Sequence, residues 1–333
     1  IKIMLKLFLF SMLTYTLYSS TLYLTTSSNP SRINPLLATD SASGEIANWI
    51  FNGLVKYDKN GNIVGDLAQS FKFRDNKTLI FKLRTNVLWH DKKPFSAKDV
   101  LFTYQLLKSK KIVSPYSNDF RLVEKLILID DYTIEIHYSV PYFKALNIWM
   151  MGILPKHILE NEPNLMTSSF NRNPIGTGSY RLKSMELSKA IILEANEDYF
   201  LHKPSIQTIH YSVIPDSSSR YMQVRALKSD IGDLSPLQYE RELSQKLLSY
   251  YQVVEKTAQS YTYLGFNLRD KKFKNKKTRE AIALAINKKE IVDILFFGHG
   301  KPCYGPFLPD GFAYNKKYEK NIFDPLKSKK LLE

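Results

Sequence analysis

Two glycines in residues 173–180, "NPIGTGSY", could cradle a phosphate group. A phosphate loop needs a strand before the glycines and a helix after them, so that the helix N-terminus faces the anion. Here Tyr180 and Leu182, and later Ile191 and Leu193, alternate with other residues, which predicts two strands joined by a turn. No Lys-Ser or Lys-Thr pair follows the glycines either. The stretch therefore predicts a tight bend at a domain crossing rather than a nucleotide site.

The pair His90-Asp91 in "LWHDKKPF" could supply a general base or two metal ligands. A protein metal site usually needs three or four ligands, and no H-x-x-E or H-x-H partner lies nearby in the sequence. The pattern favours a turn with a hydrogen-bonded histidine and predicts no metal site. The remaining histidines are scattered singly along the chain, at His137, His157, His202, His210 and His299.

Cys303 is the only cysteine, which excludes a disulfide within this sequence and a multi-cysteine metal site. The local "KPCYGP" offers only Lys301 as a base, so a buried or neutral thiol is expected. In the preceding "FFGHGKP", Pro302 would interrupt any following helix, and Gly298 is expected to close a helix C-terminus. Motifs of the G-x-S-x-G, S-x-x-K and H-E-x-x-H kinds are missing from the sequence, which predicts that this protein is not an enzyme and uses no cofactor.

The chain is basic, with 47 Lys+Arg against 32 Asp+Glu and a net charge of +15. Such a charge raises the question of nucleic-acid binding, because phosphate neutralisation dominates that affinity. The densest run, "KKFKNKK" over residues 271–277, holds a single aromatic residue, Phe273, and no RNP-like, zinc-finger or helix-turn-helix pattern accompanies it. The pattern favours a solvated basic face and no nucleic-acid partner.

The N-terminus has the shape of a secretory signal peptide. In "IKIMLKLFLFSMLTYTLYSS", Lys2 and Lys6 precede an apolar run over residues 7–13, and small polar residues follow. That run is short for a membrane span. We predict a signal peptide over residues 1–19, cleaved near residues 19–21, with an uncleaved anchor or a buried first strand as the alternatives. It contains no cysteine that could carry a lipid.

The 333 residues suffice for two or three domains, and 44% apolar residues indicate a globular chain. Residues 20–26 predict a strand, and a helix with Ile46, Ile50 and Leu54 on one face follows, with Ser43 as its cap. Asn60-Gly61 indicates a turn. Strands and helices alternate irregularly, which favours a mixed α/β architecture of several lobes.

Three further segments have clear periodicity. Residues 78–84 alternate as a half-buried strand, and "KLILIDDYTIEIHY" predicts a hairpin that turns at Asp130-Asp131. Ser96 and Asp99 have the spacing of a capping box before a helix. Residues 276–296 predict a helical segment with a pause near Asn287.

Several of these segments together resemble the family 5 extracytoplasmic solute-binding proteins, the peptide- and nickel-binding receptors of ABC importers. "LIFKLRTNVLWHDKKPFSAKDVLFTYQLL" is similar to their F-x-L-R-x-x-V-x-W-H-D-G-x-P-F-x-A-x-D-V signature, and "NPIGTGSYRL" to their N-P-[IV]-G-T-G-P-Y. "NWIFNGLVKYDKNGNIVGDLAQSF" and the segment that begins "YLGFNLRDKKFKNKKTREAIALAINKKEI" match two more patterns in family order. Departures fall at turn and packing positions: Lys92, Ser179, Thr278 and Asn287 replace Gly, Pro, Val and Asp, and Gly65, Asp66 and Phe71 also differ.

The resemblance implies an α/β, two-lobed periplasmic binding protein of type II with an extra inserted small domain. The main lobe would comprise residues 20–48 and 173–260, the small domain residues 49–172, and the start of the second lobe residues 261–333. Family members run to about 500 residues, so we expect a fragment or a truncated gene product with an incomplete second lobe, which alone binds peptide weakly or not at all.

The implied function is the capture of short peptides in the periplasm by a monomer that delivers them to the ABC permease subunits in the membrane. A nickel or metal-chelate receptor of the same fold is the alternative, and an inert truncated product is another. By alignment, the implied ligand-facing residues are Ala38, Thr39, Asp40 and Ser41, in an edge segment that pairs with the peptide backbone, together with Tyr116, Tyr261 and Tyr263.

Overall fold

The computed structural model describes residues 20–255, 260–308, 313–319 and 323–333. The predicted signal peptide over residues 1–19 lies outside the described residues. The chain divides into two compact units, one up to Gly232 and the other from Asp233 to Glu333. Within the described ranges, no helix combines the length and the apolar character that a membrane span requires. The fold is mixed α/β, as predicted.

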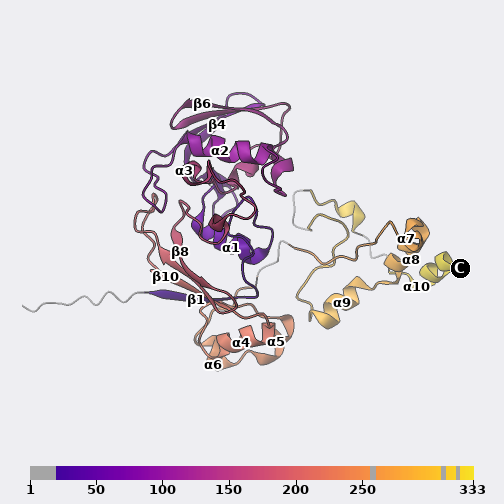
Figure 1. Ribbon diagram of the computed structural model, residues 1–333. Coiled ribbons are helices and arrows are strands. Elements are labelled where there is room, and N and C mark those ends of the chain that lie inside the picture. Colours follow the sequence, from indigo (N-terminus) through magenta and orange to yellow (C-terminus); the bar gives the residue numbers. More distant parts are fainter. Residues whose placement is uncertain (1–19, 256–259, 309–312, 320–322) are drawn as a thin grey trace, which may run out of the picture. The chain divides into compact units, whose positions relative to one another are not determined.

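The first sheet of the first unit contains four strands in the order β1-β10-β9-β8 (Figure 1). They are β1 (Thr21–Thr26), β8 (Tyr180–Glu186), β9 (Ala190–Ala195) and β10 (Thr208–Val213). β1 pairs with β10 in parallel, and the other two pairings are antiparallel. Alternate side chains of β9 and β10, such as Ile191 and Tyr211, are buried. The strand predicted at residues 20–26 and the two predicted after the glycine loop are therefore confirmed.

Helix α1 (Ser41–Ile50) begins at a different cap from the one predicted. Asp40 is the N-cap, and its Oδ1 accepts a hydrogen bond from the N–H of Ser43 at 2.8 Å. The prediction of Ser43 as the cap was wrong. The helix also ends at Ile50, because Phe51 has extended backbone angles, so Leu54 lies beyond it. Ile46, Ile50 and Leu54 are nevertheless all buried.

The second sheet is antiparallel, in the order β4-β5-β7-β6. Its strands are β4 (Ala68–Phe73), β5 (Thr78–Leu83), β6 (Val123–Asp130) and β7 (Thr133–Tyr138). Ile134, Ile136 and Tyr138 face the core, which confirms the predicted hairpin. A separate hairpin of β2 (Val55–Tyr57) and β3 (Ile63–Gly65) turns at Gly61, whose φ of +83° favours glycine.

Helix α2 (Ala97–Lys108) contacts β6 (Figure 1). It begins with the predicted capping box of Ser96 and Asp99. Short helical segments complete this unit: η1 (Ser117–Phe120), η2 (Asn147–Met150), α3 (Lys156–Leu159), η3 (Ser169–Asn171) and α4 (Ser217–Arg225). One contiguous apolar core runs from the first sheet through α1 to the second sheet. It includes Trp89, Phe95 and Trp149.

In the described part of the second unit, the regular elements are short helices joined by irregular segments. This part contains α5 (Pro236–Glu242), α6 (Gln245–Leu248), α7 (Lys271–Lys274), α8 (Lys276–Ala285), α9 (Lys288–Leu295), η4 (Lys316–Tyr318) and α10 (Pro325–Leu332). Asn287 is the N-cap of α9, which confirms the predicted pause. Gly298, at φ +81°, follows α9 and donates its N–H to Val292 O, as expected for a helix end.

Candidate functional site

Two of the sequence-predicted ligand-facing segments lie together in the first unit. The hydroxyl of Tyr116 donates to the backbone oxygen of Ala38 at 2.6 Å. Two residues earlier, Ser114 Oγ donates to Leu36 O, also at 2.6 Å. These bonds cross 78 positions of sequence, and both are part-buried. The 114–116 loop therefore holds the segment just before α1 at two successive points.

Thr39 is the residue in this segment whose backbone is left open. It is exposed, while Ala38 beside it is buried at 6%. The N–H of Ala38 donates to Asn34 O and its carbonyl accepts from Tyr116. Within the described residues, neither the N–H nor the carbonyl of Thr39 has a hydrogen-bond partner. An exposed backbone group beside a fixed one is able to pair with an extended chain.

Asp40 has a structural task. Its carboxylate accepts hydrogen bonds from Ser43 N, from Ser43 Oγ at 2.7 Å and from Ser31 Oγ at 2.5 Å. Burial raises the pKa of Asp40, but the bonds from the two serines outweigh it, and the net pKa lies below the usual value. Ser41 is exposed as the first residue of α1. The carboxylate of Asp40 therefore caps the helix.

Tyr261 and Tyr263 belong to the second unit, which is described by itself. Their side chains are 44% and 76% exposed, and their ring centroids lie 6.0 Å apart at an angle of 54°. They form an exposed aromatic pair that a planar or apolar group could contact. Their place as ligand contacts stays a prediction.

The glycines of residues 173–180 allow a close approach of two backbones. A Cβ on Gly176 would lie 1.8 Å from Ile50 O, and one on Gly178 would lie 2.2 Å from Trp49 O. The N–H of Gly178 donates to Ile50 O at 2.8 Å. Neither glycine has a positive φ. The loop thus docks on the C-terminal end of α1, and its glycines serve geometry, as predicted.

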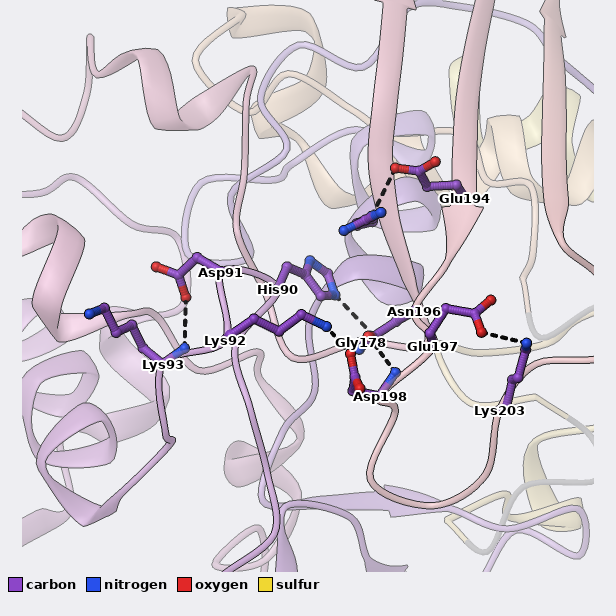
Figure 2. A network of polar contacts seen from close by, with 11 residues as sticks. His90, Asp91, Lys92, Lys93, Gly178, Glu194, Asn196, Glu197, Asp198 and Lys203 are labelled. Atoms are coloured by element: carbon purple, nitrogen blue, oxygen red, sulfur yellow. Dashed lines mark hydrogen bonds and ion pairs between the residues drawn. The ribbon is translucent and has the colours of Figure 1, made fainter.

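His90 forms hydrogen bonds with both glycines through its two ring nitrogens, and Figure 2 shows the bond to Gly178. Its Nδ1 accepts from the N–H of Gly176 at 3.2 Å, and its Nε2 lies 3.0 Å from Gly178 O, where it donates. Its own N–H donates to Gly176 O. Burial lowers the pKa of His90 to about 4, although the bond to Gly178 opposes the shift. The imidazole is therefore neutral, and the predicted hydrogen-bonded histidine in a turn is confirmed.

Lys92 stands in a backbone conformation that favours glycine, with φ of 69°. Its ammonium group forms an ion pair with Asp198, which follows β9 (Figure 2). Asn196 donates to Gly178 O at 3.0 Å from the same connection. The positive φ gives a physical reason for the glycine that the resembling signature has at this position.

Sequence reasoning missed the partners that buttress these loops. Ser114 was not singled out, and neither was Thr177, whose Oγ1 donates to Asn52 Oδ1 at 3.0 Å. Asn52 in turn donates to Asp66 Oδ2 at 2.8 Å. These pairs lie 125 and 14 positions apart, and a serine or threonine in a loop carries no local signal of a distant partner.

The other candidate residues, Asp91 and Cys303, belong to different units in the described part of the chain. Oδ2 of Asp91 lies 2.8 Å from Nε2 of His157, so this contact brings together one histidine and one carboxylate. Cys303 is partly exposed rather than buried, and its Sγ lies 3.0 Å from Gly305 O. Among the residues that the structure describes, no three His, Cys, Asp or Glu side chains are grouped so as to hold a metal.

Comparison with known proteins finds a match over residues 62–333 to the bacterial extracellular solute-binding proteins, family 5. The chain is 32% identical over 311 residues to the oligopeptide-binding protein AppA of Bacillus subtilis, covering 91% of this chain and 57% of the relative. It is 27% identical over 343 residues to the dipeptide-binding protein of Escherichia coli, covering 95% of this chain and 63% of the relative. The chain thus spans less than two thirds of the length of these relatives.

Solved structures of binding proteins are also similar to this chain. The structure of AppA from Bacillus subtilis in complex with a nonapeptide is similar with a TM-score of 0.84 at 30% identity, over 94% of this chain and 63% of that one. NikZ from Campylobacter jejuni in complex with Ni(L-His) has a TM-score of 0.86 at 30% identity, over 94% and 62%. The mixed α/β fold therefore matches that of periplasmic binding proteins. The family pattern, the relatives and the fold agree, and the chain belongs to the bacterial extracellular solute-binding proteins of family 5.

Proposed function

We propose that this protein is the substrate-binding component of an ABC importer and captures short peptides outside the cytoplasm for a membrane permease. The observation that carries the proposal is the exposed, unpaired backbone of Thr39 beside Ala38, whose carbonyl is held by Tyr116. A fixed, open backbone segment suits the recognition of an extended peptide by main-chain hydrogen bonds. Relatives that bind oligopeptides and dipeptides support this choice of ligand.

The mechanism is one of binding without catalysis. Peptide main-chain groups would pair with Thr39, and wet pockets would accept varied side chains. The carboxylate of Asp40 is hydrogen-bonded to Ser43. Asp40 would therefore contact the peptide only through its backbone. Tyr261 and Tyr263 would contact the peptide from the second unit. A monomer that closes on its peptide by a hinge motion is the form that would meet the permease.

We also propose that the chain is divided into lobes as its resemblance to the family implies. Residues 20–48 with 173–260 would form the main lobe, residues 49–172 the inserted small domain, and residues 261–333 the start of the second lobe. The docking of Gly176 and Gly178 on Ile50 supports a crossing at this point. A signal peptide over residues 1–19 would direct the chain to the periplasm.

A metal-chelate receptor is the second candidate, because the likeness to NikZ with Ni(L-His) is as close as the likeness to AppA. Since the described residues offer no group of three metal-binding side chains, the metal would have to arrive with its own ligands, as in a nickel–histidine chelate.

Calorimetric titration separates the two candidates. The protein is titrated with mixed di- to pentapeptides and with nickel–histidine. The same titrations are repeated on an extended protein, in which the chain is joined to the part of Bacillus subtilis AppA that it does not span. We expect heat with peptides, weak for the chain alone and in the micromolar range for the extended protein, or roughly −8 kcal/mol. Heat with nickel–histidine and none with peptides would overturn the proposal.

A further inference from the structure

The second unit carries a dense group of exposed lysines, which we call the basic face. It consists of Lys271, Lys272 and Lys274 of α7 and Lys276 and Lys277 in the first turn of α8. All five side chains are exposed. The segment also contains Arg269 and Arg279, and its one acidic residue over positions 269–279 is Asp270.

These lysines are not neutralised by neighbours. In the described part of the chain, no carboxylate lies within ion-pair distance of their ammonium groups. Asp270 is used as the N-cap of α7, accepting from the N–H of Lys272 at 2.9 Å. Glu280 faces Lys327 of α10 at 3.8 Å. Lysines elsewhere in the protein, by contrast, are often paired, as Lys56 is with Asp66.

The backbone adds to the positive charge rather than relieving it. Asn275, a neutral residue, caps α8 by accepting from the N–H of Lys277 at 2.9 Å, and the first turn of α8 has no acidic residue. The positive end of the helix dipole therefore lies among lysines, an arrangement that weakens the helix unless an anion comes near.

The neighbouring helix extends the same charge. Ser328 Oγ donates to Ala281 O at 2.7 Å, and the N–H of Asp324 donates to Leu284 O at 2.9 Å. These two bonds show that α10 runs antiparallel to α8. The last turn of α10, with Lys329 and Lys330, thus lies toward the end of α8 that carries the basic face.

The partner that this face fits is a surface rather than a small anion. The lysines come from two helices, α7 and α8, and Arg279 donates to the carbonyls of Phe273 and Lys274. Phe273, the one aromatic residue of this run, is part-buried and packs on Phe266 with ring centroids 5.4 Å apart. A flexible set of point charges suits the headgroups of an anionic bilayer, and the family to which the chain belongs is extracellular.

We propose that the basic face binds anionic lipid headgroups and holds the protein against the outer surface of the membrane in which its permease would lie. The proposal is independent of which solute the protein takes. Binding of the basic face to lipid would raise the local concentration of the protein at the membrane. Salt would weaken this binding by screening the charges. Each lysine that comes near the surface should contribute roughly fivefold to the binding constant.

Vesicle co-sedimentation tests the proposal with the whole chain. Vesicles of phosphatidylcholine alone are compared with vesicles that contain roughly one third phosphatidylglycerol, at about 0.05 M and about 0.5 M salt. We expect binding to the anionic vesicles that is lost at the higher salt. The double variant Lys276→Gln/Lys277→Gln should bind about 25-fold more weakly.

A charge-matched control separates the basic face from net charge. Lys59→Gln/Lys72→Gln removes the same charge from two exposed lysines of the first unit and should change vesicle binding by less than about twofold. Circular dichroism confirms that both variants are folded. Equal losses in the two double variants, absence of binding to anionic vesicles at low salt, or binding of RNA in preference to vesicles would each overturn the proposal.

Discussion

His90 donates from Nε2 to the backbone oxygen of Gly178 at 3.0 Å, across 88 positions of sequence. Its other ring nitrogen accepts from Gly176, so one neutral imidazole satisfies both a donor and an acceptor of the crossing loop. An imidazolium could not accept that bond, because both of its nitrogens carry hydrogen. The loop at which the chain re-enters the first sheet is therefore sensitive to the protonation of His90.

The first prediction concerns acid stability. The folded pKa of His90 is about 4, below its ordinary value of 6.5. The unfolded chain binds the proton first, so the contribution of His90 is complete above pH 6.5 and is lost as pH falls toward 4. We expect a loss of up to roughly 3 kcal/mol in the free energy of unfolding over this window. Urea unfolding against pH measures it, and His90→Gln should flatten this part of the profile. An unchanged profile in that variant would show that other groups govern the acid transition.

The second prediction concerns the crossing loop. Gly176→Ala would place a methyl group 1.8 Å from Ile50 O, so α1 and the loop must separate. We expect a loss of at least about 3 kcal/mol in the free energy of unfolding. Gly44 lies within α1 with no atom within 4 Å of an added Cβ. Gly44→Ala is the matched control and should stabilise by about 0.5–1 kcal/mol. A mild effect of Gly176→Ala in chemical denaturation would contradict the close approach.

The third prediction concerns Lys92. Lys92→Gly relieves a φ of 69° but removes the ion pair with Asp198. The side chains of this pair are 58% and 46% exposed, so the pair contributes at most about 1 kcal/mol. Relief of the left-handed conformation should offset it, and we expect a change between zero and about 1 kcal/mol of stabilisation. Asp198→Asn, which removes the pair alone, should destabilise slightly. Thermal unfolding compares the two, and a marked loss in Lys92→Gly would show that the ion pair outweighs the backbone.

The fourth prediction concerns the positioning role of Tyr116. Tyr116→Phe keeps the ring but releases Ala38 O, at a cost of about 1 kcal/mol in the free energy of unfolding. Because the segment before Thr39 loosens, we expect peptide affinity of the extended protein to fall about fivefold. Tyr104→Phe removes a comparable hydroxyl bond, to Val123 O, far along the chain from Thr39. It should cost similar stability and leave peptide affinity unchanged in calorimetry. If Tyr116→Phe and Tyr104→Phe lost equal peptide affinity, Tyr116 would stabilise the fold without positioning the binding segment.

The fifth prediction concerns His299 in the second unit. Its Nε2 lies 2.7 Å from Glu240 Oε1 and its Nδ1 lies 3.2 Å from Glu255 Oε1, with the ring of Tyr239 against it. The two glutamates raise the pKa of His299 above its ordinary value. Its contribution to stability is thus complete below pH 6.5 and is lost as pH rises through the raised pKa. Proton NMR titration should find the raised value in the wild type and a return toward 6.5 in Glu240→Gln. An ordinary value in the wild type would refute the double contact.

Several strands and the start of α2 follow from local patterns. Alternation in β5 and β7 and the Ser96–Asp99 capping box depend on neighbouring residues, so sequence suffices to predict them. Asp40 and Ser43 are both good cap residues three positions apart, and the local pattern does not decide between them. The segment after α1 makes a distant contact that no local pattern predicts, because Gly53 lies against Met150 O, where a Cβ would be 2.5 Å away.

The candidate site is harder to predict from sequence because it is built from long-range contacts. Resemblance alone pointed to Ala38 and Tyr116, and the structure shows them bonded to each other. Ser114 and the open backbone of Thr39 became visible only in the structure, because neither residue type distinguishes a free backbone from a paired one.

The most direct test of the account follows the backbone amide of Thr39 by NMR while a tetrapeptide is added. We expect that in the extended protein the Thr39 signal shifts with a dissociation constant in the micromolar range, or about −8 kcal/mol, and that the chain alone gives a weak shift or none. A peptide N-methylated at every peptide nitrogen keeps its carbonyl acceptors but loses its amide donors, so it can accept from Thr39 N–H but cannot donate to Thr39 O, and it should shift the signal less than the unmodified tetrapeptide. If the Thr39 signal of the extended protein does not shift with the tetrapeptide, or shifts equally with the N-methylated peptide, main-chain peptide recognition is contradicted.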